Sequence, residues 1–123
     1  MEPMNKLRIL IADDHPLFRQ GVRSVLENTE DMEVVGEAAS GDEAIRQAIE
    51  LKPDVVLMDI RMPGLNGVEA TAQIKSIHSD IQILVLTMFK DDASVITAMK
   101  SGARGYILKD SDKEDILRAI RAT

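Results

Sequence analysis

The segment LRILIADD, residues 7–14, decides the fold of this chain. It is a run of apolar residues, mostly Leu and Ile, and it ends in two aspartates. Consecutive apolar residues are typical of a strand that is buried on both faces, as the strands of a parallel sheet are. The segment DVVLMD, residues 54–59, repeats the pattern and also ends in an aspartate. Two such segments predict a parallel sheet that is covered by helices on both faces.

Three further apolar runs extend this pattern along the chain. The predicted strands are Leu7–Ala12, Glu33–Ala38, Asp54–Met58, Gln82–Thr87 and Gly105–Leu108. The second strand is the most ambiguous, because only Val34 and Val35 in it are strongly apolar. A stretch with helical periodicity follows each strand, which predicts an α/β fold of five βα units. Two strand orders fit this size, and we expect the commoner one, the flavodoxin-like doubly wound order 2-1-3-4-5.

Local signals place the ends of several predicted helices. Ser40 with Glu43, and Ser111 with Glu114, have the spacing of a capping box and predict the starts of the second and fifth helices. Gly102 lies where the fourth helix should terminate.

Length, composition and charge exclude several classes of protein. The 123 residues fit one domain, and the content of 45% hydrophobic and 29% charged residues is that of an ordinary globular protein. Because there is no cysteine, a disulfide scaffold and a thiolate metal site are excluded. A net charge of −6 argues against DNA binding by this domain itself. Without a membrane or signal segment, we expect a cytoplasmic protein.

Four of the predicted strands end in side chains that suit one reaction. These residues are Asp13 and Asp14 after the first strand, Asp59 after the third, Thr87 at the end of the fourth and Lys109 after the fifth. In a parallel sheet all carboxyl ends lie on one edge, and the first and third strands would flank the switch point where such sheets bind ligands. Three adjacent carboxylates repel one another, and Mg²⁺ would relieve that repulsion.

A carboxylate beside Mg²⁺ can act as a nucleophile toward phosphorus and form an aspartyl phosphate. Lys109 can neutralise the transferred group, and Thr87 can donate a hydrogen bond to it. Taken singly, each aspartate has a simpler interpretation as a helix cap or turn residue, and Thr87 and Lys109 as solvated loop residues. Their occurrence together at four strand ends favours a site for phosphoryl transfer.

At these residues the chain resembles the receiver domain of bacterial two-component response regulators. The resemblance rests on Asp13-Asp14, on Asp59 in LMDIRMPG (57–64), on Thr87, and on Lys109 in GYILK (105–109), and it covers essentially the whole chain. The segment ADDHP (12–16) and the Lys109-Asp110 pair further resemble the subfamily that carries a helix-turn-helix output domain of the NarL/LuxR type.

The resemblance implies a role for each residue. Asp59 would accept a phosphoryl group from a sensor histidine kinase. Asp14 and Asp59 would ligate Mg²⁺ directly, Asp13 would act largely through water, and the backbone carbonyl of Arg61 would complete the protein ligands. Lys109 would pair with Asp59 and then with a phosphoryl oxygen. The chain would be no enzyme, with self-catalysed phosphorylation and autodephosphorylation as its only chemistry.

The resemblance also implies a switch. Thr87 would move toward the phosphoryl group and Tyr106 would turn inward behind it, which would remodel the face formed by helix four, strand five and helix five. A phosphoryl group adds roughly −1.5 to −2 charge, which suffices to favour one of two loop arrangements. Tyr106 could instead be an aromatic that covers the core on an edge strand. Arg61 and Phe89 would tune the phosphoryl lifetime, and Met88 would restrict Thr87 or access for water.

The same resemblance bears on partners and on the domains of the whole protein. Residues 1–123 would be the receiver of a longer regulator whose C-terminal DNA-binding domain is not part of this chain. A homodimer is expected on phosphorylation, through helix one, helix five or the face of helix four, and the sequence does not choose among these surfaces. A stand-alone phosphorelay receiver is the alternative.

Three competing interpretations have weaker support. A Mg²⁺-dependent phosphohydrolase of the haloacid-dehalogenase type would need a second acid two residues after Asp59, where Arg61 stands. A flavin-binding module would need a Ser/Thr-rich loop after the first strand. A docking receiver that has lost phosphorylation is disfavoured, because every required residue is present. We interpret His15 as a helix-capping residue and His78 as a surface residue.

Overall fold

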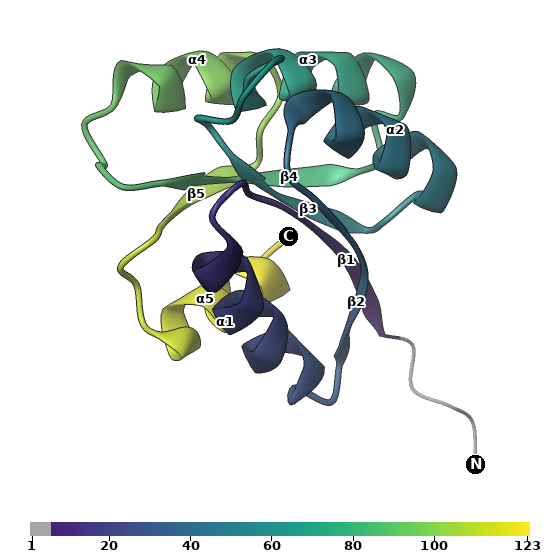
Figure 1. The fold of residues 1–123 in the computed structure, drawn as a ribbon, viewed down its shortest axis with the longest axis vertical. Helices are drawn as coiled ribbons and strands as arrows, with labels where there is room; N and C mark the ends of the chain where they lie inside the picture. Colours follow the sequence, from purple (N-terminus) through teal and green to yellow (C-terminus); the bar gives the residue numbers. More distant parts are fainter. Residues whose placement is uncertain (1–5) are drawn as a thin grey trace.

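The computed structural model describes residues 6–123, in which strands and helices alternate from end to end (Figure 1). The strands are β1 (Leu7–Ala12), β2 (Met32–Ala38), β3 (Val55–Asp59), β4 (Gln82–Thr87) and β5 (Gly105–Leu108). The helices are α1 (Pro16–Glu27), α2 (Gly41–Leu51), α3 (Gly67–Ile77), α4 (Ala93–Lys100) and α5 (Lys113–Arg121).

The sheet has the predicted topology. Its five strands are all parallel and follow the order β2-β1-β3-β4-β5, which confirms the flavodoxin-like (βα)5 fold. Figure 1 shows α1 and α5 on one face of the sheet and α2, α3 and α4 on the other. Every connection therefore returns over a face of the sheet, and all strands end at the same edge.

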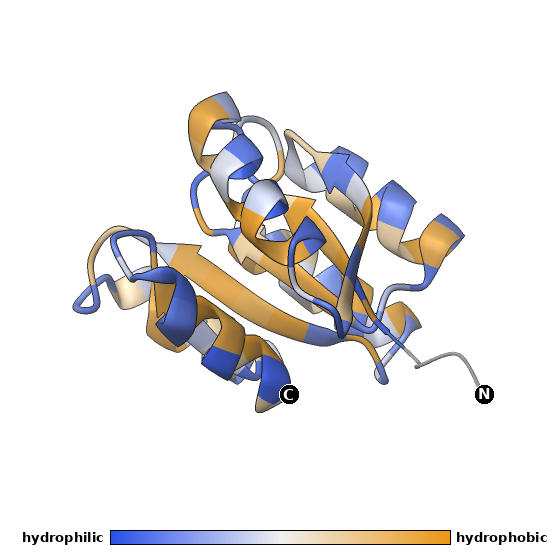
Figure 2. Cartoon of the chain, turned by 90° about the horizontal axis from the view of Figure 1, so that it is seen from below, coloured by the Kyte–Doolittle hydropathy of each residue, from blue (hydrophilic) through white to orange (hydrophobic). Residues whose placement is uncertain are grey.

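Alternation along the central strands explains why both faces are covered. In β1, Ile9 and Ile11 belong to the core under α1 and α5, whereas Leu10 belongs to the core under α2 and α3. In β3, Leu57 and Met58 divide between the two cores in the same way. Figure 2 shows the resulting apolar sheet between helices that mix hydrophilic and hydrophobic residues. The uninterrupted apolar runs of the sequence are thus the consequence of a sheet without a solvent face.

The helix ends follow the sequence signals with one exception. The Ser40 side chain accepts a hydrogen bond from the Glu43 backbone N–H at 3.2 Å, and Gly102 follows α4 with a positive φ of 116°, as a helix C-terminus favours. The predicted capping box at Ser111 is wrong by one residue. Asp112 is the N-cap of α5, and its carboxylate accepts from the backbone N–H of Asp115 at 2.9 Å.

Two close approaches tie the loop after β3 to the rest of the fold. A Cβ added at Gly67 would lie 2.1 Å from the carbonyl oxygen of Asp59, and one added at Gly41 would lie 1.8 Å from that of Leu65. Only glycine allows these backbones to approach so closely. Among residues 6–123, no helix is long and apolar enough to cross a membrane.

Candidate functional site

The centre of the site is Asp59, the last residue of β3. It continues the strand ladder opposite Leu86, so its backbone is fixed by the sheet, and the residue is 3% exposed. The predicted strand ended one residue earlier, at Met58. The Asp59 Oδ1 atom accepts a hydrogen bond from the backbone N–H of Arg61 at 3.1 Å, and Oδ2 accepts one from Lys109 Nζ at 3.1 Å.

Two more carboxylates lie beside Asp59 because β1 and β3 are neighbours. Asp13 is fully buried, and its Oδ2 atom is 2.8 Å from Lys109 Nζ. Asp14, the next residue, keeps its side chain about one-third exposed at 32%. The structure brings these three carboxylates and one ammonium together at this edge of the sheet.

Lys109 reaches these acids from the end of β5. Its side chain is 6% exposed, and its ammonium lies 5.0 Å from the centroid of the Phe18 ring, as in a cation–π contact. One ammonium thus faces Asp13 and Asp59 together, so the buried pocket retains an excess of negative charge. The Lys109–Asp110 peptide bond is trans.

The excess charge alters the protonation of Asp59. Burial and, to a smaller extent, the negative charge of Asp13 raise the pKa of the Asp59 carboxyl from 3.8 to about 6, against the opposing effects of the Arg61 N–H and of Lys109. Such a carboxylate is held in its charged form at an energetic cost. A cation that binds beside it would recover that cost, which is the physical reason to expect a metal here.

His15 corrects one sequence interpretation. The residue occupies the N-cap position of α1, but its side chain makes no capping hydrogen bond to any described residue. Its Nδ1 atom instead lies 3.0 Å from Asp13 Oδ1, 3.3 Å from Asp14 Oδ1 and 3.0 Å from Lys109 Nζ. The imidazole thus faces the charged groups at the edge of the sheet and not the end of α1, and sequence spacing gave no signal of this. His78 is the C-cap residue of α3 and partly exposed.

Thr87 and Tyr106 occupy the positions from which a switch would start. The Thr87 side chain is buried, and its hydroxyl donates to the Phe89 carbonyl at 3.2 Å while accepting from the Phe89 N–H at 3.3 Å. The ring of Tyr106 is not buried behind Thr87, because the residue is 45% exposed. Phe89 and Met88 are more exposed still, at 70% and 59%.

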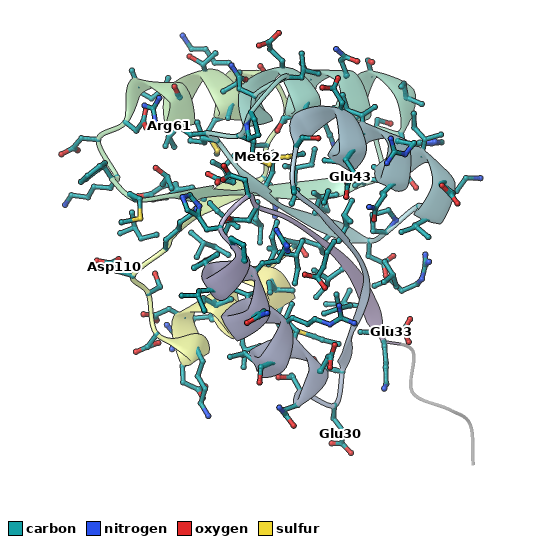
Figure 3. All side chains as sticks on the ribbon, viewed as in Figure 1. Glu30, Glu33, Glu43, Arg61, Met62 and Asp110 are labelled. Atoms are coloured by element: carbon teal, nitrogen blue, oxygen red, sulfur yellow. The ribbon has the colours of Figure 1, made fainter. Side chains whose placement is uncertain are left out.

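A pocket of about 290 Å³ opens onto these groups. It is lined by Asp14, His15, Asp59, Ile60, Arg61, Leu86, Thr87, Met88, Phe89, Asp92 and Lys109. Figure 3 places Arg61, after β3, and Asp110, after β5, on the same side of the molecule, the side at which the strands end. The pocket is large enough for a phosphoryl group and its leaving group, and it brings together all the predicted site residues except Asp13 and Tyr106.

Sequence reasoning missed a contact at the rim of this pocket. The Arg61 guanidinium donates to Asp92 Oδ2 at 2.8 Å, and Asp92 Oδ1 accepts from the Ser94 N–H at 2.9 Å as the N-cap of α4. The backbone N–H of Ser94, together with Arg61, lowers the pKa of Asp92. One residue thus connects the loop of the phosphoacceptor candidate to the start of α4. An Asp before a helical stretch was a visible capping signal, whereas its Arg61 partner was not.

The donor set of the pocket fits a divalent cation. Asp13, Asp14, His15 and Asp59 each offer a ligand atom, and these atoms all lie within 4.8 Å of one another. Two buried oxygens, Asp13 Oδ2 and Asp14 Oδ1, accept no hydrogen bond from any residue within 6–123, and Asp13 Oδ2 is paired by charge alone with Lys109. Unsatisfied carboxylate oxygens are what a hard cation such as Mg²⁺ binds. The Arg61 carbonyl follows Asp59 closely enough in sequence to be a further candidate ligand.

The fold and this site together define a class of protein. Residues 9–121 match the family model described as the response regulator receiver domain, and the chain belongs to that family. It is 37% identical to the signal receiver domain of the putative response regulator NarL from Mycobacterium tuberculosis, with a TM-score of 0.91 over 96% of this chain and 95% of that one.

Curated relatives narrow the class further. The chain is 48% identical to the transcriptional regulatory protein LiaR of Bacillus subtilis, over 94% of this chain and 55% of that protein. It is likewise 48% identical to the response regulator protein VraR of Staphylococcus aureus, over 95% of this chain and 56% of that protein. The chain is therefore a receiver domain of the NarL/LuxR subfamily, and it spans a little over half the length of the curated relatives it matches.

Proposed function

We propose that this domain is a phosphorylation-dependent switch in two-component signalling and that Asp59 is its phosphoacceptor. The observation that carries the proposal is the state of Asp59. Its carboxylate is buried beside Asp13 and Asp14, it pairs with Lys109, and it faces a pocket of about 290 Å³. A nucleophile, a cation for the transferred group and an acidic cluster for Mg²⁺ thus meet at one point, as phosphoryl transfer requires.

In the proposed reaction, a carboxylate oxygen of Asp59 attacks the phosphorus atom of the donor. A P–O bond forms, and the bond between phosphorus and the donor breaks with its electron pair left on the donor group. Lys109 then pairs with a phosphoryl oxygen in place of the carboxylate. Mg²⁺, when bound, would be held by Asp14, Asp59 and the Arg61 carbonyl, with Asp13 acting largely through water, and would offset negative charge on the transferred group.

The switch that we propose begins at Thr87. Its hydroxyl now hydrogen-bonds within the β4–α4 loop, to the backbone of Phe89. A phosphoryl oxygen is a stronger acceptor than the Phe89 carbonyl, so phosphorylation would draw Thr87 toward Asp59. The vacated space would admit the exposed ring of Tyr106 and change the face of α4, β5 and α5. Arg61 and Phe89, at the pocket rim, would tune the phosphoryl lifetime.

The setting of this switch is also a proposal. We infer a sensor histidine kinase as phosphodonor, a homodimer on phosphorylation and a cytoplasmic location. Because LiaR is named a transcriptional regulatory protein, residues 1–123 would act as the receiver that controls a C-terminal DNA-binding domain. A stand-alone phosphorelay receiver is the alternative. The domain would have no catalytic turnover beyond its own phosphorylation and autodephosphorylation.

Intact mass spectrometry tests this proposal. The chain is incubated with acetyl phosphate, with Mg²⁺ or with EDTA, beside Asp59→Asn and the matched control Asp80→Asn, an exposed acid after α3. We expect one phosphoryl adduct on the wild type and on the control, and none on Asp59→Asn or in EDTA. An adduct of equal yield on Asp59→Asn would overturn the proposal, and phosphate release without any adduct would point to a phosphohydrolase.

A further inference from the structure

The side chain of His15 faces the acidic cluster and not the helix that it precedes. Its Nδ1 atom is 3.0 Å from Asp13 Oδ1 and 3.3 Å from Asp14 Oδ1. The imidazole is 62% exposed, so the core does not force this orientation. A nitrogen donor therefore lies among the carboxylate oxygens where the divalent cation of the proposed function would bind.

The separations match the edges of a coordination octahedron. Ligand atoms at about 2.1 Å from a metal and at right angles to each other lie about 3.0 Å apart. The distances from His15 Nδ1 to Asp13 Oδ1 and Asp14 Oδ1 are close to this value. The nitrogen is thus spaced from each of these two oxygens as one ligand is from its neighbour.

Hydrogen bonding alone accounts poorly for the position of Nδ1. If this nitrogen carries a proton, it can donate to Asp13, but it then meets the Lys109 ammonium at 3.0 Å, donor against donor. If it carries a lone pair, it can accept from Lys109, but it then faces carboxylate lone pairs. A cation bound between the unprotonated Nδ1 and these oxygens would relieve the repulsion between their lone pairs, and Lys109 would keep Asp13 Oδ2 at 2.8 Å and Asp59 Oδ2 at 3.1 Å as partners.

We propose that His15 is a ligand of the divalent cation in this pocket and that it shifts the preference of the site from Mg²⁺ toward first-row transition ions such as Co²⁺. Mg²⁺ prefers oxygen ligands, whereas imidazole nitrogen strengthens the binding of transition ions. The inference rests on the proposed function only in that both place a divalent cation among Asp13, Asp14 and Asp59. It adds the imidazole of His15 to the direct ligands of that proposal, which are Asp14, Asp59 and the Arg61 carbonyl.

Calorimetric titration of the whole chain with Co²⁺ and, separately, with Mg²⁺ tests the inference. His15→Ser keeps a good N-cap residue for α1 but is too short to reach the cation. His78→Ser is the matched control, since His15 and His78 are the two histidines of the chain and cysteine is absent. We expect His15→Ser to bind Co²⁺ about tenfold more weakly, with Mg²⁺ affinity unchanged within about twofold. His78→Ser should match the wild type for both ions.

Equal factors of change for Co²⁺ and Mg²⁺ in His15→Ser would overturn the inference, because a displaced Lys109 or a general electrostatic effect acts on both ions alike. No change for either ion would overturn it as well. The acetyl phosphate experiment is scored separately. A chain that gives no Asp59 adduct but shows the Co²⁺-specific loss would lose the proposed function and keep His15 as a ligand.

Discussion

The middle of the sheet and its carboxyl edge differ sharply although they belong to the same strands. In the middle of β3, Val56 and Leu57 are fully buried among apolar side chains. Two residues after Leu57, Asp59 is buried almost as deeply at 3% exposure, but beside Asp13 and a single compensating ammonium. Burial that stabilises the first region therefore costs stability in the second.

This difference shows that the residues that stabilise the fold and the residues that form the candidate site have different requirements. The apolar centres of β1 and β3 fix the backbone, and that backbone holds Asp13 and Asp59 side by side although their charges repel. A surface placement would relieve the repulsion but would also weaken the electrostatic interactions available to a phosphoryl group. The rigid sheet therefore holds the carboxylates in an arrangement that costs stability. A divalent cation, alone or together with a phosphoryl group, would offset that cost.

The largest expected effect lies in the strand centre. Leu57→Ala should lower the free energy of unfolding by about 2–5 kcal/mol, because it leaves a cavity at a fully buried position. Urea denaturation measures this loss. Leu17→Ala, at a position 84% exposed, is the control and should change stability by less than about 0.5 kcal/mol. Similar losses in both variants would abolish the contrast between the two regions.

A substitution of Asp59, at the carboxyl edge of the sheet, should raise the free energy of unfolding instead of lowering it. Because the folded pKa of Asp59 is raised from 3.8 to about 6, the folded state binds more protons in that window, and wild-type stability should fall as pH rises through it. Asp59→Asn lacks this loss and should be more stable than wild type at pH 7 by up to roughly 3 kcal/mol without metal, but not near pH 3.5. Urea titrations in EDTA across this range measure the difference, and a gain independent of pH would contradict it.

Bound Mg²⁺ should offset part of the loss of stability that the buried carboxylates cause at the carboxyl edge of the sheet. Mg²⁺ at 100 times its dissociation constant should raise the free energy of unfolding by about 2.7 kcal/mol, because only the folded chain assembles the acidic cluster. Asp14→Asn should largely remove this gain, whereas the exposed control Asp80→Asn should retain it. Thermal unfolding with and without Mg²⁺ reports the effect. The same stabilisation in both variants would place the cation elsewhere.

The smallest effect is expected at the rim of the pocket. Arg61→Ala should cost less than about 1 kcal/mol, since its partner contact with Asp92 joins an exposed guanidinium. Asp92→Ala should cost about 1 kcal/mol, because it also removes the N-cap of α4. Chemical denaturation of the two variants and the double variant separates the contribution of the Arg61–Asp92 contact from that of the N-cap of α4. A larger loss in Arg61→Ala than in Asp92→Ala would contradict this division.

Most of the fold could be predicted because periodicity reports burial. Apolar runs gave β1, β4 and β5 with their observed bounds, and gave β2 and β3 to within one residue at each end. The shift of β3 to include Asp59 depends on pairing with Leu86, which local sequence does not encode. The start of α5 was misplaced because Ser111 and Asp112 both offer a capping oxygen, and only the backbone decides between them.

The same distinction applies to the candidate site, where sequence predicts some features and only the folded chain shows others. The grouping of Asp13, Asp59 and Lys109 follows from strand order, so sequence sufficed. The side-chain directions of His15 and Tyr106 depend on charges and packing contributed by distant strands, and sequence did not supply them. The pairing of Arg61 with Asp92 and the close approach of Gly67 to Asp59 are likewise contacts between segments that meet only in the folded chain.

Borohydride trapping is the most direct test of whether the carboxyl edge is a phosphoacceptor site. Borohydride reduces an aspartyl phosphate to homoserine, which peptide mass spectrometry locates by residue. After acetyl phosphate and Mg²⁺, we expect homoserine at position 59 alone, and none when Mg²⁺ is withheld. Homoserine at position 13 or 14, or its absence from a folded chain that binds Mg²⁺, would contradict the assignment of Asp59.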